Sequence, residues 1–169
     1  MPKFSPGESA RSQRERKGRI LPRVLIVEEQ ANQARVMAIG LRLEGFDVET
    51  AAGPTEALER LAAQPFDLAV VDLMLPGTNG IQLARIVRER HPATRVVLMS
   101  AYHLSERQLE RADCGAAGFV PKPLDLGELA QFLRSKAPGS PGTFELPDAT
   151  PEALVETQTP TVAGTAAPR

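Results

Sequence analysis

The chain has 169 residues, and its 20 Lys and Arg against 21 Asp and Glu give a formal net charge of −1. The 42% apolar content excludes a chain that is disordered throughout, and a single cysteine, Cys114, excludes a disulfide framework or a multi-cysteine metal site. Because the sequence has no run of 18 apolar residues and no signal-peptide core, we expect a cytoplasmic protein without a membrane span.

Charge and composition divide the chain into three parts. Residues 1–23 carry seven basic and two acidic residues, residues 24–136 carry twelve and fifteen, and residues 137–169 carry one and four. The first part has no helical or strand period, and the last contains recurrent proline, which removes backbone donors. We therefore expect a disordered basic arm, one folded domain and a disordered, Pro-rich acidic tail, in which a short helical turn at 151–156 stays open.

The folded part alternates between short apolar runs and amphipathic segments. The pattern predicts, in chain order, a strand at 24–27, a helix at 30–43, a strand at 46–50, a helix at 54–63, a strand at 68–71, a helix at 79–90, a strand at 95–99, a helix at 104–112, a strand at 118–120 and a helix at 124–135. Such alternation is typical of an α/β fold with a parallel sheet and helices on both faces. Five units predict the flavodoxin-like, doubly wound strand order 2-1-3-4-5.

Polar side chains follow the strands that this order places centrally. Glu28 and Glu29 follow the first strand, Asp72 the third, Ser100 the fourth and Lys122 the fifth. Carboxylates that meet at one rim repel each other unless a cation lies among them, and oxygen ligands favour Mg²⁺. A lysine and a hydroxyl beside them would complete a pocket for a tetrahedral anion, so the pattern indicates phosphoryl chemistry at an aspartate.

Four runs carry a resemblance to a known family: VLIVEE at 24–29, VVDLMLPGTNG at 70–80, MSA at 99–101 and GFVPKP at 118–123. In order and spacing they resemble the receiver domain of two-component response regulators, over nearly all of residues 24–136. Four dispersed motifs together are specific, whereas any one alone is weak.

The resemblance implies a role for each rim residue. Asp72 would accept a phosphoryl group from a histidine kinase or phosphotransfer protein in a phosphorelay. Glu28 and Glu29 would hold Mg²⁺, with Glu29 as the direct ligand, and Asp72 and the Met74 backbone carbonyl would be further ligands. The domain would be a phosphoryl acceptor rather than an enzyme, with slow self-dephosphorylation at most.

The resemblance also implies partners for the phosphoryl group. Lys122 would pair with Asp72 or its phosphate, and Ser100 would hydrogen-bond the phosphoryl oxygens. Phe119 would turn inward as Ser100 moves, and Pro123 would follow a cis bond that aims the ammonium inward. The chain uses Arg sixteen times and Lys four times, so the ammonium of Lys122 indicates a need for a compact point charge.

The acidic pair departs from the family pattern, which usually has Asp where Glu29 stands. Mg²⁺ tolerates displaced ligands poorly, so a longer side chain leaves two alternatives. Either metal binding survives with weaker affinity, or the domain is a pseudo-receiver that binds partners without being phosphorylated. Retention of Asp72, Ser100 and Lys122 favours phosphorylation.

The expected output is protein binding. Residues 137–169 are too rich in proline to form a DNA-binding or catalytic domain, which predicts a stand-alone receiver. The predicted switching face comprises residues 104–112, 118–120 and 124–135. We do not expect the basic arm to bind nucleic acid, and homodimer formation stays open. A phosphatase with an aspartate nucleophile is disfavoured, since Met74 stands where such enzymes carry a second Asp.

Overall fold

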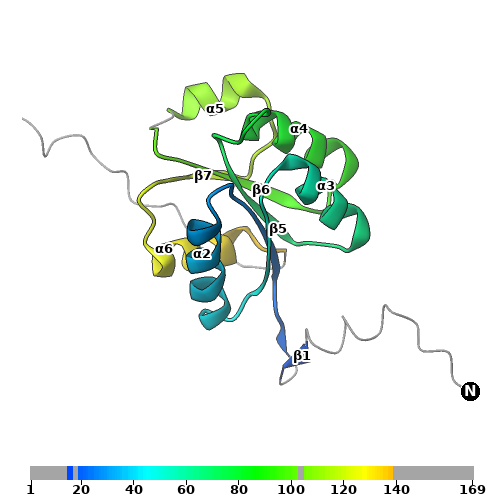
Figure 1. The fold of residues 1–169 in the computed structure, drawn as a ribbon, viewed down its shortest axis with the longest axis vertical. Coiled ribbons are helices and arrows are strands. Elements are labelled where there is room, and N and C mark those ends of the chain that lie inside the picture. Colours follow the sequence, from blue (N-terminus) through cyan, green and yellow to red (C-terminus); the bar gives the residue numbers. More distant parts are fainter. Residues whose placement is uncertain (1–14, 17–18, 103–104, 139–169) are drawn as a thin grey trace, which may run out of the picture.

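A computed structural model of the chain describes residues 15–16, 19–102 and 105–138 (Figure 1). Its helices and strands are β1 Glu15–Arg16, β2 Arg19–Ile20, β3 Arg23–Val27, α2 Ala31–Leu43, β4 Asp47–Ala51, α3 Pro54–Ala63, β5 Leu68–Asp72, α4 Gly80–Arg90, β6 Arg95–Ser100, α5 Glu106–Ala112, β7 Gly118–Pro121 and α6 Leu126–Lys136. The predicted elements of the folded domain are therefore present, with ends that differ by one or two residues.

The five longer strands form one parallel sheet in the order β4-β3-β5-β6-β7. Numbered along the domain, this is the predicted order 2-1-3-4-5, which is confirmed. β3 and β5 lie centrally and are buried along their whole length, which is why both read as unbroken apolar runs. No helix in the described part of the chain has the length and apolar composition that crossing a membrane requires.

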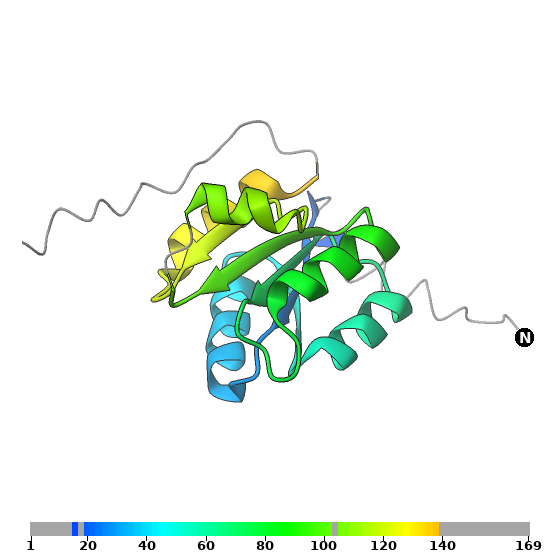
Figure 2. The same ribbon diagram turned by 90° about the horizontal axis from the view of Figure 1, so that it is seen from above.

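The sheet separates two apolar cores because successive side chains of a strand point to opposite faces. Val24 and Ile26 of β3 pack on the side of α2 and α6, whereas Leu25 and Val27 pack on the side of α3 and α4. Figures 1 and 2 show these two helix pairs on opposite sides of the sheet. Helices on both faces, as predicted, leave the carboxyl ends of the strands as an open rim.

Two findings change the predicted limits of the folded part. β1 and β2 form a short antiparallel pair, with Glu15 opposite Ile20, although residues 1–23 were expected to lack structure; two-residue strands are too short to leave a period in the sequence. β3 starts at Arg23, which is buried between Asp47 and Glu49. The rest of the basic arm and the tail from 139 on, including the turn considered at 151–156, lie outside the described residues.

The starts of the helices follow local sequence signals, with one exception. The side chain of Asn79 caps α4, that of Ser105 caps α5 and that of Asp125 caps α6, each by accepting a backbone N–H three residues on. α2 instead begins after Gln30, whose side chain makes no capping bond to the backbone. The amide of Gln30 is therefore available for another contact.

Candidate functional site

Residues from three strand ends meet at the carboxyl rim of the sheet. Glu28 directly follows β3, Asp72 is the last residue of β5, and Lys122 follows β7. The Lys122 Nζ lies 2.6 Å from Asp72 Oδ2 and 2.8 Å from Glu28 Oε2. One ammonium therefore joins two carboxylates that come from positions 44 residues apart in the sequence.

Asp72 is held on both carboxylate oxygens. Its Oδ2 accepts from Lys122, and its Oδ1 accepts a hydrogen bond of 2.9 Å from the backbone N–H of Met74. The residue is only 7% exposed. Gly80 lies so close behind it that a Cβ at that position would be 2.5 Å from the Asp72 carbonyl oxygen, so the turn into α4 requires glycine.

Lys122 donates to three acceptors. Besides Asp72 and Glu28, its Nζ lies 3.2 Å from Gln33 Oε1 on the first turn of α2. Its backbone N–H donates to the carbonyl of Ser100 at 2.8 Å, which ties the segment after β7 to the end of β6. Burial lowers the pKa of Lys122, but the hydrogen bonds and charges of Asp72 and Glu28 outweigh burial and raise it above its ordinary value. The lysine therefore carries a firmly held positive charge.

The two glutamates differ sharply in environment. Glu28 is 2% exposed, its Oε1 accepts from the backbone N–H of Gln30 at 3.0 Å, and its Oε2 accepts from Lys122. Glu29 is exposed and makes no hydrogen bond or ion pair within the described residues. Glu28, Glu29 and Asp72 were expected to converge. Only Glu28 and Asp72 do so, and the ammonium of Lys122 joins them.

The types of residue at the rim fit a hard divalent cation, although their side chains are not arranged around one. Glu29, Asp72 and the backbone carbonyl of Met74 offer oxygen ligands only, which fits Mg²⁺. No group of three or more His, Cys, Asp and Glu residues in the described segments is arranged to share an ion. The chemistry of the residues fits the metal, and assembly of the site requires the exposed side chain of Glu29 to turn inward.

The remaining predicted residues lie around this cluster. Ser100 is fully buried at the end of β6, and its Oγ accepts a hydrogen bond from the backbone N–H of Tyr102 at 3.0 Å. Phe119 is partly buried against the core on the α3 and α4 side. The Lys122–Pro123 peptide bond is cis, as the resemblance implied. Ser100 and the cis peptide bond thus lie at the carboxyl ends of β6 and β7, next to the Lys122 cluster.

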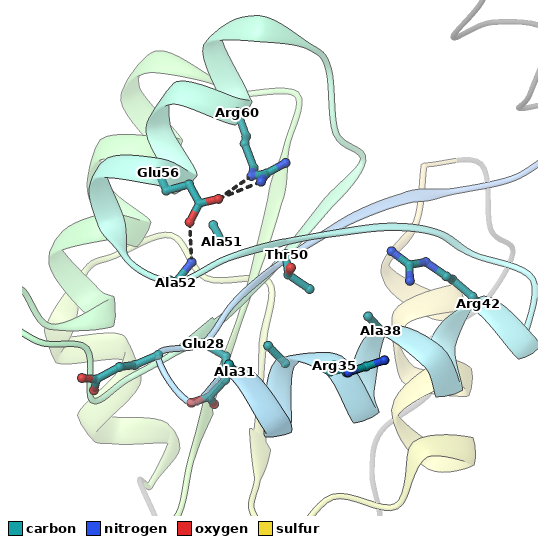
Figure 3. A pocket seen from close by; sticks show the side chains of 12 residues that line it. Glu28, Ala31, Arg35, Ala38, Arg42, Thr50, Ala51, Ala52, Glu56 and Arg60 are labelled. Atoms are coloured by element: carbon teal, nitrogen blue, oxygen red, sulfur yellow. Dashed lines mark hydrogen bonds and ion pairs between the residues drawn. The ribbon is translucent and has the colours of Figure 1, made fainter.

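A groove of about 270 Å³ lies beside the acidic rim, between α2, β4 and the start of α3 (Figure 3). Glu28 and Ala31 lie near one end of it and Arg42 near the other. Five alanines leave the space open, and the arginines along it are partly engaged, since Arg60 pairs with Glu56 and Arg42 donates to the Val48 carbonyl. The groove gives solvent access to the exposed side of the acidic pair.

Sequence reasoning missed two features of the site. Gln33 brings an amide group to Lys122 and is itself bound by the amide of Gln30, and the only signal was their position at the start of the helix that follows the acidic pair. Large apolar side chains are also exposed near the rim and along the outer face of α2: Met74, Tyr102, Val36, Ile39 and Leu43. Val36, Ile39 and Leu43 follow helical spacing, but their exposure is a tertiary property.

Comparison with known proteins agrees with this geometry. The family model described as response regulator receiver domain matches residues 24–134. The response regulator protein PilR of Pseudomonas aeruginosa is 33% identical over 111 residues, which are 66% of this chain and 25% of PilR. The response regulator ArlR of Staphylococcus aureus is 30% identical over 115 residues, 68% of this chain and 52% of ArlR. The chain thus spans between a quarter and about half of the length of these relatives.

Solved structures give the same result. A CheY-like receiver domain protein from Methanospirillum hungatei superposes with a TM-score of 0.64 at 27% identity, covering 69% of this chain and 93% of that one. TrrA from Thermotoga maritima, solved in complex with Mg²⁺-BeF, gives 0.62 at 25% identity, covering 69% and 99%. With its sheet order and rim residues, this chain belongs to the response regulator receiver-domain family of two-component systems.

Proposed function

We propose that Asp72 accepts a phosphoryl group from a histidine kinase or phosphotransfer protein. The observation that carries the proposal is the contact of 2.6 Å between Asp72 Oδ2 and Lys122 Nζ at the carboxyl end of β5. The hydrogen bonds to Asp72 hold its carboxylate in one orientation for attack on phosphorus. The ammonium of Lys122 would balance the negative charge that the phosphoryl group brings.

Phosphoryl transfer to Asp72 forms one bond and breaks another. An oxygen of Asp72 attacks phosphorus and forms an O–P bond while the N–P bond of a phosphohistidine donor breaks. The electron pair of that bond stays on the imidazole nitrogen, which takes a proton from solvent. After transfer, one oxygen of Asp72 is the bridging oxygen of an acyl phosphate, and Lys122 donates instead to a phosphoryl oxygen, which is the stronger acceptor.

Mg²⁺ would be held by Glu29, Asp72 and the backbone carbonyl of Met74, with Glu28 beside them. When bound, the ion would neutralise charge on the phosphoryl oxygens. Glu28 already accepts from Lys122 and from the Gln30 backbone, so its part is to hold the lysine. The exposure of Glu29 supports its assignment as the side chain that can still turn toward a ligand.

Ser100 and Phe119 would transmit the change. Ser100 Oγ accepts from Tyr102, so a hydroxyl that turns to the phosphoryl oxygens must release that backbone group. β7 pairs with β6 with Phe119 opposite Leu98, so movement at the end of β6 reaches the neighbouring strand. The output would be protein binding through α5, β7 and α6, and homodimer formation through this face is an outcome that its test would detect.

Exposed apolar side chains beside the site support a protein as the phosphoryl donor. Met74 and Tyr102 follow the strands that end in Asp72 and Ser100, and both are more than half exposed. Exposed apolar residues that gather at a functional rim are typical of a protein contact. A small-molecule phosphodonor would not need to contact such a surface.

The competing function is a pseudo-receiver that binds partners without phosphorylation. The observation that favours it is the same acidic pair, because both positions are Glu and the described side chains assemble no three-carboxylate metal site. In that case the Lys122 cluster would be a structural ion pair, and partner binding would not respond to a phosphodonor.

One experiment separates the two functions. The full chain is incubated with Mg²⁺ and acetyl phosphate, and an acid-stable, base-labile phosphoryl adduct is sought by mass spectrometry. We expect an adduct on the wild-type chain and on Asp113→Asn, whose carboxylate lies on the exposed end of α5, and none on Asp72→Asn. Absence of any adduct on the wild-type chain, together with no change on addition of beryllofluoride, would support the pseudo-receiver.

A further inference from the structure

Lys122 has a third partner that lies outside the strand-end motifs. Its Nζ is 3.2 Å from Gln33 Oε1, against 2.6 Å to Asp72 and 2.8 Å to Glu28. An ammonium has three donors, so these three acceptors use its full capacity. Gln33 supplies the only neutral acceptor among them and comes from α2, an element that carries no other contact to the lysine among the described residues.

The orientation of the Gln33 amide is fixed by its own neighbours. An ammonium can only donate, so the atom that faces Lys122 must be the amide oxygen. The Gln33 Nε2 in turn donates to Gln30 Oε1 at 2.7 Å. Because Gln30 makes no capping bond to the backbone, its amide is committed to Gln33 instead.

These contacts close a ring. Lys122 donates to Glu28 Oε2, the Gln30 backbone N–H donates to Glu28 Oε1, the Gln33 amide donates to Gln30, and Lys122 donates to Gln33. Each of the four groups is thereby restrained by two others. Removal of one member of such a network loosens the rest.

We propose that Gln33, braced by Gln30, is a positioning residue that fixes the Lys122 ammonium for phosphoryl transfer at Asp72. The inference rests on the proposed phosphorylation of Asp72. Of the three acceptors of Lys122, Asp72 is the one that changes, because its carboxylate becomes an acyl phosphate. Glu28 and Gln33 do not react, so their two bonds hold the ammonium while its third donor passes from Asp72 to a phosphoryl oxygen.

The direction of the effect follows from this division. Without Gln33, the ammonium keeps one fixed bond instead of two and spends less time where phosphoryl charge develops. Gln33 is exposed, so water replaces part of the lost bond and the effect is modest. A weak hydrogen bond to a charged group corresponds to a loss of about three- to tenfold in rate.

The test compares two glutamines at the same helical position. Gln33 is the third residue of α2, and Gln82 is the third residue of α4, exposed and without a side-chain contact among the described residues. Gln33→Met and Gln82→Met remove the same amide at similar helix propensity. Gln30→Met removes only the brace.

Initial labelling rates are measured on the full chain over a range of acetyl phosphate concentrations with saturating Mg²⁺. We expect Gln33→Met to lower the maximal rate about three- to tenfold at an unchanged half-saturating concentration, Gln30→Met to lower it less, and Gln82→Met to match the wild-type chain. The final extent of labelling should be equal in all four, because the fold is intact.

Three outcomes overturn the inference. Gln33→Met may not differ from Gln82→Met; its loss may lie wholly in the half-saturating concentration, which would make Gln33 a donor contact; or its final extent may fall, which would indicate misfolded protein. A labelled wild-type chain with any of these leaves the proposed function standing. An unlabelled wild-type chain overturns both.

Discussion

Arg23, which is buried, and Lys122, which is partly buried, are cations at opposite ends of the same sheet, and each is paired with two carboxylates. Arg23 begins β3 and has a side chain that is 8% exposed, with Nη2 2.6 Å from Glu49 Oε1 and Nε 3.2 Å from Asp47 Oδ2. Lys122 follows β7 with a side chain that is 18% exposed, at 2.6 and 2.8 Å from its partners. The charges match, but the surroundings do not.

Arg23 lies among fixed structural partners, although its buried Nε makes an ion pair with Asp47 without a hydrogen bond. Its guanidinium carbon lies 5.0 Å from the centroid of the Phe66 ring, its backbone N–H donates to Asp67, and Glu49 also accepts from Arg60. A planar guanidinium suits partners that never change, whereas a compact ammonium can follow an acceptor that does. The comparison links the guanidinium to a fixed structural network and the ammonium to the site where, under the proposed function, an acceptor changes.

Arg23→Met should have the largest effect, a loss of about 3 kcal/mol in the free energy of unfolding measured by urea denaturation. Methionine keeps the apolar stem of arginine, so the loss of stability measures the cost of leaving the two carboxylates unpaired. Asp47 is partly exposed, so water lowers its share of that cost. Arg88→Met removes an exposed pair with Asp113 and should cost less than about 1 kcal/mol. Equal losses in the two variants would show that the Arg23 network is not special.

Lys122→Arg should separate function from stability. The guanidinium cannot take the place of a point charge between Glu28 and Asp72, so labelling by acetyl phosphate should slow at least about tenfold. The reciprocal change, Arg23→Lys, should leave labelling unaffected and lower the free energy of unfolding by about 1 kcal/mol as one of two contacts is lost. Slower labelling in Arg23→Lys would contradict the division between the two clusters.

Much of the fold could be predicted because its signals are local. The apolar runs at 24–27 and 68–71 each reflect one segment and its burial. Arg23 was wrongly assigned to the disordered arm for the same reason, because a basic residue that follows a basic segment has no local signal of a strand. Its burial depends on Asp47 and Glu49, which lie on another strand, and on Phe66 beyond them.

The site was predictable to the level of the strand ends, the pairing of Lys122 with Asp72 and the cis bond before Pro123. The order of the strands brings Glu28, Asp72 and Lys122 to one rim, and the structure places them in contact. The side-chain arrangement depends on which cation occupies the space between the carboxylates. Sequence reasoning placed a metal there and expected three carboxylates, whereas Lys122 joins two of them and Glu29 stays exposed.

A third comparison is the pH dependence of the unfolding free energy at alkaline pH, measured with a chelator so that no metal is bound. The pKa of Lys122 is raised above its ordinary value of 10.5, so the folded state holds the proton more tightly than the unfolded chain does. Its contribution to stability is complete below that value and is lost as pH rises through the folded-state pKa. Above about pH 10.5, the unfolding free energy should fall more steeply with pH for the wild-type chain than for Lys122→Met. Parallel profiles would mean that the pair adds nothing to stability.

Glu29→Asp should give the smallest effect, a gain of about threefold in Mg²⁺ affinity, followed by NMR chemical shifts. The shorter side chain loses less rotamer freedom on binding and suits the strict octahedral geometry of Mg²⁺ better. Glu89→Asp makes the same change at an exposed position on α4 and should leave affinity unchanged. If Glu29→Asp gives no gain, Glu29 is not a metal ligand, and Lys122 alone then supplies the positive charge at Asp72, whereas Arg23 and Arg60 share Glu49 at the other end of the sheet.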